Sequence, residues 1–221
     1  GCNIAKEFSK YPQYSLYGID SEPHDLQNFI KIAKRKDHES YEQRFPSARA
    51  KKFLKPAGED VLIVLGGSGA ISGAVLRLIE VIKDKNISVL YIRPDIELLS
   101  YKKAMRERLV FSVLQEYARS KLLDKIYLVD NLKLESILGS VPLVSYHQNL
   151  NNLLVYTFHM MNVLKNSSPI INTFSEPNIT SNIATIGIMD IDKGLEKPFF
   201  DLEYTREAIY YYAINSDSLE T

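Results

Sequence analysis

Apolar residues along the chain alternate between short β-branched runs and longer stretches with helical spacing. The run at residues 61–65 is apolar at every position, as expected of a strand that is covered on both faces. We therefore predict strands at residues 14–20, 61–65, 87–92 and 125–130.

Between these runs the apolar positions recur every three or four residues, which is typical of helices with one buried face. In residues 102–123 this spacing gives two adjacent stripes, Met105, Leu109, Val113 and Tyr117, with Val110, Leu114 and Ala118 beside them. Strands that alternate with helices predict an α/β fold with a parallel sheet and right-handed crossovers. The predicted helices are residues 74–82, 102–123 and the long 145–166.

The last part of the chain has a different pattern. A β-type run at residues 182–190 is followed by a helical pattern at residues 203–215. One strand and one helix cannot bury a core by themselves, so this part is either an appendage or the start of a second, α+β domain.

Composition narrows the class of protein. Of the 221 residues, 45% are hydrophobic, and 27 lysines and arginines balance 27 aspartates and glutamates. A neutral chain gives no reason to expect direct nucleic-acid binding or broad membrane-surface binding. Cys2 is the one cysteine, so no internal disulfide forms and a reducing compartment fits. Without an apolar run of about 20 residues or a secretory leader, we expect a cytoplasmic protein with no membrane span.

The clearest local motif is the glycine-rich segment at residues 65–73, which follows an apolar strand and precedes a helix. Glycines let the backbone approach a ligand closely, and successive N–H groups form a nest for anions, so the segment is a candidate phosphate site. The alternative is a tight turn that needs glycine for its dihedral angles. A Walker lysine is absent and the GxGxxG spacing is not met, which argues against a dinucleotide-dependent enzyme.

This segment resembles the signature of the tubulin/FtsZ family, which is usually written GGGTGSG or GGGTGTG. Four positions match it, namely Gly67, Gly69, Ser72 and Gly73, while Ser68, Ala70 and Ile71 replace a glycine, a threonine and a glycine. The resemblance implies that the whole run, Ala70 included, surrounds the phosphates of a nucleotide.

Other segments resemble the family in the same order. The opening Gly1, Cys2 and Asn3 resemble the end of the first glycine-rich loop, which holds phosphate and base, so residues are expected to be missing ahead of it. Asp20 and Glu22 resemble the acids of the tubulin segment that ends Asp-Leu-Glu-Pro, which implies a place beside Mg²⁺ and phosphate.

The next resemblances concern the nucleoside. Glu97 matches the loop acid that contacts the ribose, and Asn131 matches an asparagine beside the nucleotide. In the long helix, His147 takes the place of the aromatic residue that stacks on guanine. Asn151, one turn later on the same face, takes the place of the residue that hydrogen-bonds the base edge.

The catalytic expectation rests on one loop. In FtsZ this loop carries acids that position the attacking water in the active site of the neighbouring subunit. Asn172 matches the loop, and Glu176 is its only acid, although it falls between the two expected positions. The resemblance therefore implies weak or lost GTPase activity, with Glu176 as the catalytic candidate.

Taken together, the resemblance implies a tubulin/FtsZ-like protein that binds GTP or GDP with Mg²⁺ and assembles head to tail into a homopolymer, as open heterologous contacts do. The predicted domains are a GTP-binding domain at residues 1–144, a central helix at 145–166, and a partial C-terminal activation domain at 167–221, with truncation at both ends. The alternative is a non-hydrolysing structural or regulatory module of the same fold, which binds nucleotide or only a partner.

Overall fold

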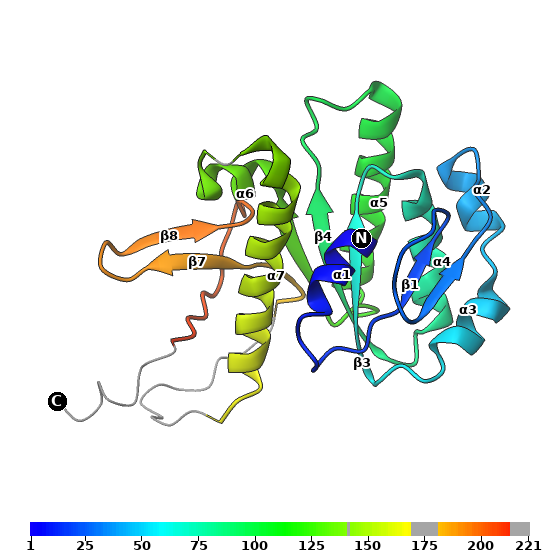
Figure 1. Cartoon of the computed structure of the whole chain (residues 1–221), viewed down its shortest axis with the longest axis horizontal. Helices are drawn as coiled ribbons and strands as arrows, with labels where there is room; N and C mark the ends of the chain where they lie inside the picture. Colours follow the sequence, from blue (N-terminus) through cyan, green and yellow to red (C-terminus); the bar gives the residue numbers. More distant parts are fainter. Residues whose placement is uncertain (141, 169–180, 213–221) are drawn as a thin grey trace.

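The computed structural model describes residues 1–140, 142–168 and 181–212. Its centre is a sheet of four parallel strands, which lie side by side in chain order (Figure 1). The strands are β3 (Asp60–Gly66), β4 (Asn86–Arg93), β5 (Lys125–Asp130) and β6 (Ile183–Thr185). This architecture confirms the predicted α/β fold with a parallel sheet.

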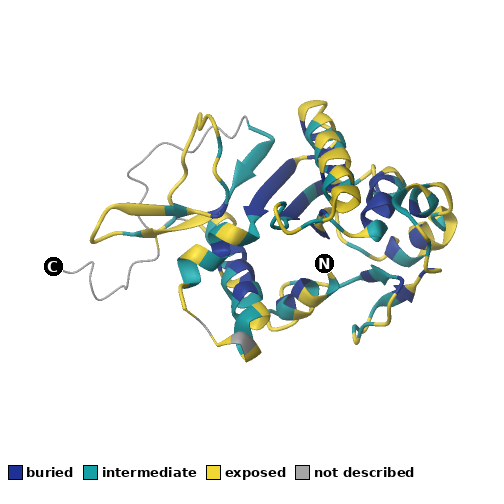
Figure 2. Ribbon diagram, turned by 90° about the horizontal axis from the view of Figure 1, so that it is seen from above, coloured by how far each residue is buried: buried dark blue, intermediate teal, exposed yellow. Residues whose placement is uncertain are grey.

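Helices cover both faces of the sheet, as the view from above shows (Figure 2). Side chains on a strand alternate between faces, so Val89 and Tyr91 of β4 point into one core cluster and Leu90 and Ile92 into the other. The first cluster is closed by α4 (Ala74–Val81) and α5 (Tyr101–Arg119), and the second by α1 (Cys2–Phe8) and α7 (Tyr146–Lys165).

The remaining elements flank this sandwich. A separate two-stranded parallel sheet lies on the β3 side of the molecule, together with two short helices (Figure 1). Asp37 caps the first of these helices by accepting a hydrogen bond from the Ser40 N–H at 2.9 Å. The elements are β1 (Gly18–Asp20), β2 (Phe29–Lys31), α2 (His38–Gln43), α3 (Ser47–Leu54), η1 (Ala70–Gly73), α6 (Asn131–Leu138), η2 (Leu143–Ser145), β7 (Gly187–Asp190) and β8 (Leu195–Pro198).

The long helix predicted at residues 145–166 is confirmed as α7, but three other predictions need correction. Only the last three residues of the strand predicted at 14–20 are paired, as β1. The run at 182–190 splits at Ile186, because β6 pairs with β5 whereas β7 turns back onto β8. The helix predicted at 203–215 is wrong for residues 203–212, which are mostly exposed and irregular, so no buried face stabilises helix there.

The first stripe predicted for α5 is confirmed only in its second half: Val113 and Tyr117 pack, half buried, against the core, and the first two members do not. Met105 and Leu109 are 52% and 58% exposed, whereas Val110, Leu114 and Ala118 of the neighbouring stripe are buried against the sheet. The helix is rotated so that the second stripe faces β4 and β5.

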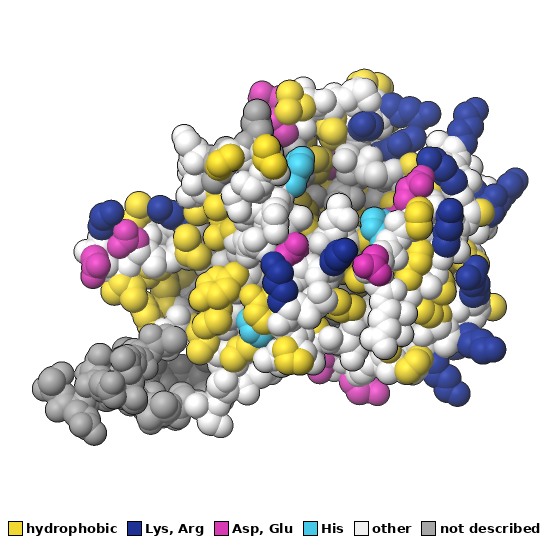
Figure 3. Space-filling model, viewed as in Figure 1, with side chains coloured by type: hydrophobic (Ala, Val, Ile, Leu, Met, Phe, Trp, Pro, Cys, Tyr) yellow, Lys and Arg dark blue, Asp and Glu magenta, His cyan; other side chains and the backbone are white. Residues whose placement is uncertain are grey.

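The chain is neutral in total, but its positive side chains are not spread evenly over the surface. Lysines and arginines gather on the side of the molecule formed by α2 and α3, at the right of Figure 3. Among the described residues, no helix is both long enough and apolar enough to cross a bilayer.

Candidate functional site

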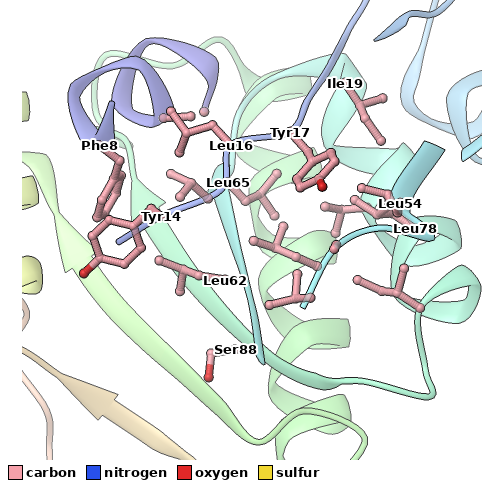
Figure 4. A pocket seen from close by; sticks show the side chains of 18 of the residues that line it. Phe8, Tyr14, Leu16, Tyr17, Ile19, Leu54, Leu62, Leu65, Leu78 and Ser88 are labelled. Carbon is pink, nitrogen blue, oxygen red and sulfur yellow. The ribbon is translucent and has the colours of Figure 1, made fainter. Parts of the chain in front are cut away.

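A cavity of about 890 Å³ runs along the whole of β3, from the loop before Asp60 to the loop after Gly66, and its upper part lies where the parallel strands end (Figure 4). Its upper part is lined by residues from three separate segments: the start of α1, the end of β1 and the loop after β3. Parallel strands place their carboxyl ends at one edge of a sheet, and ligands of α/β proteins bind at that edge. The residues from these segments are Gly1, Cys2, Asp20, Gly66, Ser68 and Gly69.

The glycine-rich loop connects β3 to η1, and its glycines have different surroundings. A Cβ on Gly67 would lie 2.1 Å from the Tyr91 hydroxyl, and one on Gly73 would lie 2.3 Å from the His38 carbonyl oxygen. Gly69 instead faces open space, with its nearest neighbour, a methyl carbon of Ile71, 3.7 Å from an added Cβ. Packing therefore explains Gly67 and Gly73, while Gly69 leaves the cavity open.

Ser72 braces the loop from within. Its side chain is fully buried, and its hydroxyl donates a hydrogen bond to the Gly69 carbonyl at 2.6 Å. The hydroxyl is therefore engaged by the backbone and does not line the cavity.

A largely buried group of three polar side chains, Tyr91, Arg93 and Glu107, packs beneath the loop. It was not identified from the sequence. The Tyr91 hydroxyl donates to Glu107 at 3.0 Å, and the Arg93 guanidinium lies 3.6 Å from the same carboxylate. Glu107 is 1% exposed. One signal for this group was available in the sequence, because Glu107 lies on the apolar stripe of its helix that contains Val110 and Leu114. A carboxylate at such a position is rarely buried unless it has a partner.

Asp20 lines the cavity at the carboxyl end of the strands, whereas two other aspartates, Asp60 and Asp124, line its opposite end. The Asp20 carboxylate accepts the Ser21 N–H at 2.6 Å and the Glu22 N–H at 3.3 Å, and it lies 3.2 Å from His24 Nε2. Cys2 completes a cluster in which the ligand atoms of Cys2, Asp20 and His24 lie within 4.8 Å of one another. Burial, with the Asp20 charge adding to it, raises the pKa of the Cys2 thiol to about 11. The thiol is therefore protonated at neutral pH.

This cluster determines which cations the site can take. Sulfur, imidazole and carboxylate together suit a zinc-like ion, while magnesium prefers oxygen and usually needs one or two carboxylates plus phosphates. Asp20 can supply one such carboxylate for magnesium. Glu22 points elsewhere, since its carboxylate pairs with Lys34 at 2.7 Å on the surface. Of the two predicted magnesium ligands, only Asp20 faces the cavity.

The structure thus brings together five of the residues singled out from the sequence, Gly1, Cys2, Asp20, Ser68 and Gly69. Others lie at the same end of the molecule but outside the cavity lining. Glu97 is an exposed residue after β4, Asn131 begins α6 directly after β5, and Asn3 is exposed on α1. His147 is exposed and Asn151 half-buried on the first turns of α7. Asn172 and Glu176 lie outside the described residues.

The fold of this chain resembles that of a protein of known structure. The chain is similar in structure to CetZ from Methanosaeta thermophila strain DSM 6194, a protein of the tubulin/FtsZ family. The TM-score is 0.53 at 11% sequence identity, over 77% of this chain and 53% of the other. The chain therefore spans about half the length of that protein. No protein-family model and no curated protein matches the sequence.

Proposed function

We propose, on the premise of a tubulin-like fold, that this chain binds GTP or GDP at the carboxyl edge of its parallel sheet. The observation that carries the proposal is the convergence of Gly1, Asp20 and Gly69 on one cavity there. Ser68 and Gly69 would let the loop backbone approach the phosphates, and Asp20 would hold the accompanying Mg²⁺. That ion would offset the phosphate charge in the site.

The base would lie toward the first turns of α7. His147 and Asn151 are one turn apart on that helix, and an amide can pair with both the donor and the acceptor on the guanine edge. Lys10, two residues after the end of α1, donates a hydrogen bond to Asn152 on α7 at 2.9 Å and so links this segment to the helix.

We further propose that the protein assembles head to tail into filaments in the cytoplasm, as heterologous contacts that do not close would do. In this arrangement Asn172 and Glu176 of one copy would meet the nucleotide of the next, with Glu176 orienting the water for slow GTP hydrolysis. The activation part at residues 167–221 would belong to this contact.

A titration with fluorescent GTP and ATP tests the binding proposal. GTP should bind more tightly than ATP, and Asn151→Ala should weaken GTP binding by about 1–3 kcal/mol, because the guanine edge loses its partner. Gln148→Ala, an exposed change on the same helix, is the matched control and should leave binding unchanged. Equal affinity for GTP and ATP would remove the base assignment.

The rival proposal is a non-hydrolysing module of the same fold. The inward-facing Ser72 hydroxyl favours it, because this matched position of the signature offers nothing to a phosphate. Sedimentation distinguishes the two proposals. A protein that forms filaments with GTP pellets in GTP and stays in solution in GDP, whereas a non-hydrolysing module behaves the same with both nucleotides.

A further inference from the structure

Three side chains that can bind a metal ion meet beside the upper part of the cavity, and they come from separate segments of the chain. Cys2 lies on the first turn of α1, Asp20 ends β1, and His24 lies in the loop between β1 and β2. Their sulfur, carboxylate oxygen and imidazole nitrogen lie within 4.8 Å of one another. All three residues are half-buried, so an ion from solvent can reach them.

The separations fit a small tetrahedral ion. Zinc binds sulfur at about 2.3 Å and nitrogen or oxygen at about 2.0–2.2 Å, so neighbouring ligand atoms around it lie roughly 3.3–3.6 Å apart. His24 Nε2 and Asp20 Oδ2 are already 3.2 Å apart. The Cys2 sulfur lies within 4.8 Å of both ligands, so a rotation of its side chain brings it to bonding distance of the same ion.

The loop after β1 orients two of the three ligands. Asp20 Oδ1 accepts the backbone N–H groups of Ser21 and Glu22 at 2.6 and 3.3 Å, which leaves Oδ2 directed at His24. The His24 ring packs edge-on against Phe29 of β2, with ring centroids 5.9 Å apart. The oxygen and the nitrogen are therefore held in place before an ion binds.

The charges around the cluster leave Asp20 available to a cation. The two other acids of this loop are paired with lysines, Glu22 with Lys34 at 2.7 Å and Asp25 with Lys6 at 3.7 Å. In the part of the chain that the structure describes, Asp20 has no lysine or arginine within ion-pair distance. A thiolate and a carboxylate would balance both positive charges of a divalent ion, so the occupied cluster would be neutral.

We propose that Cys2, Asp20 and His24 bind one zinc-class divalent ion, meaning Zn²⁺ or Co²⁺ rather than Mg²⁺. Sulfur and imidazole select such ions, because Mg²⁺ takes oxygen ligands. The thiol proton would pass to solvent as the sulfur binds. Cys2 and Asp20 line the cavity, so the fourth position of the tetrahedron would be left to water or to a ligand there. The ion needs no nucleotide, although it would share Asp20 with the Mg²⁺ of the proposed nucleotide site.

Cobalt binding to the 221-residue chain, measured without nucleotide, tests this site separately from the proposed function. Cys2 is the one cysteine of the chain, so a thiolate-to-cobalt charge-transfer band in the near ultraviolet reports on Cys2 alone. The band should saturate at one Co²⁺ per chain. Zn²⁺ should abolish the band, whereas a large excess of Mg²⁺ should leave it unchanged.

Substitutions separate the three ligands from their surroundings. Asp20→Asn and His24→Gln should each weaken Co²⁺ binding roughly tenfold or more, because each removes one ligand of three. Cys2→Ser should remove the band. Asp25→Asn changes the exposed, lysine-paired acid next to His24, so it is the matched control and should keep the wild-type affinity.

Thermal unfolding gives a second measurement on the same samples. An ion that binds only the folded chain stabilises it, so Zn²⁺ should raise the melting temperature of the wild type and of Asp25→Asn but not that of His24→Gln. A folded wild type that develops no charge-transfer band would overturn the proposal. Wild-type Co²⁺ affinity in folded Asp20→Asn and His24→Gln would overturn it too, as would saturation at one Co²⁺ per two chains, which would assign the sulfur to a site between copies.

Discussion

Gly69 and Gly73 stand four residues apart in one loop, yet the structure gives them opposite surroundings. Gly73 packs against the backbone of α2 at His38, so it is needed for close approach within the protein. Gly69 has φ −72° and ψ 144°, angles that any residue adopts, and it faces the cavity. The same substitution should therefore have different consequences at the two positions.

We predict that Gly73→Ala destabilises the fold by about 1–3 kcal/mol, because the added Cβ would push on the His38 carbonyl. Gly69→Ala should leave stability unchanged or raise it by about 0.4–1 kcal/mol, because alanine restricts the unfolded chain. Thermal unfolding of the two variants measures the difference. Equal losses would contradict the assignment of Gly73 to packing.

A larger change at Gly69 tests the ligand role alone. Gly69→Val should keep the melting temperature of the wild type within a few degrees and weaken GTP binding severely, since the side chain would project into the cavity. Normal GTP binding by this folded variant would show that the loop is only a turn.

His38 gives the protein a pH-dependent element beside this loop. Burial lowers the pKa of its imidazole, and its Nε2 has no hydrogen-bond partner among the described residues. The unfolded chain therefore binds a proton on His38 more readily than the folded chain does. This contribution to stability is complete above the ordinary histidine pKa of about 6.5 and is lost as the pH falls below it.

We expect His38→Gln to reduce the loss of stability between pH 7 and pH 5, measured by urea unfolding across that range. His147→Gln, a change at an exposed histidine, is the control and should retain the wild-type pH dependence. The same slope in wild type and His38→Gln would assign the pH dependence to other groups.

At the scale of elements, β4 and α5 are joined by the Tyr91–Glu107–Arg93 group beneath the glycine-rich loop. Tyr91→Phe should cost about 0.5–1.5 kcal/mol, the usual net value of one hydrogen bond. Glu107→Leu should cost more, because it leaves both the Tyr91 hydroxyl and the Arg93 guanidinium without their partner.

Urea unfolding of the single and double variants checks this group. Because both changes remove the same hydrogen bond, the double variant should lose less stability than the sum of the two single losses. Additive losses would mean that Tyr91 and Glu107 contribute independently.

The same helix explains which parts of the element prediction were reliable. Periodicity located α5, but residues 102–123 carry two apolar stripes and spacing does not rank them. In the folded protein Val110 and Leu114 face the sheet, since the small Ala118 on the same stripe lets the helix approach the strands. Met105 and Leu109 remain on the surface. The buried Glu107 was missed for the same reason, since its burial depends on Tyr91 and Arg93, which come from a different element.

At the scale of the whole molecule, the proposed filament gives Glu176 a role that a single copy cannot show. Glu176→Gln keeps the size of the side chain and removes its charge, so GTP binding should stay unchanged. Turnover should fall by roughly two orders of magnitude, the scale for losing a positioned catalytic group, and filaments should persist longer. Phosphate release, measured together with sedimentation, reports on both.

The outcomes of this experiment separate the two proposals. Wild-type filaments that release no phosphate would remove the catalytic role of Glu176 and favour the non-hydrolysing module. Unchanged turnover in Glu176→Gln would move that role to another residue.

The sequence by itself determined the parallel α/β class, the strands β3, β4 and β5 and the long helix α7, because strand and helix periods are local properties of the chain. It also located the glycine-rich loop between β3 and α4. Only the tertiary structure decided that Gly69 faces a cavity while Gly73 faces His38, and that Asp20 rather than Glu22 lies in the site. These outcomes depend on which distant segments meet, and local periodicity carries no record of those contacts.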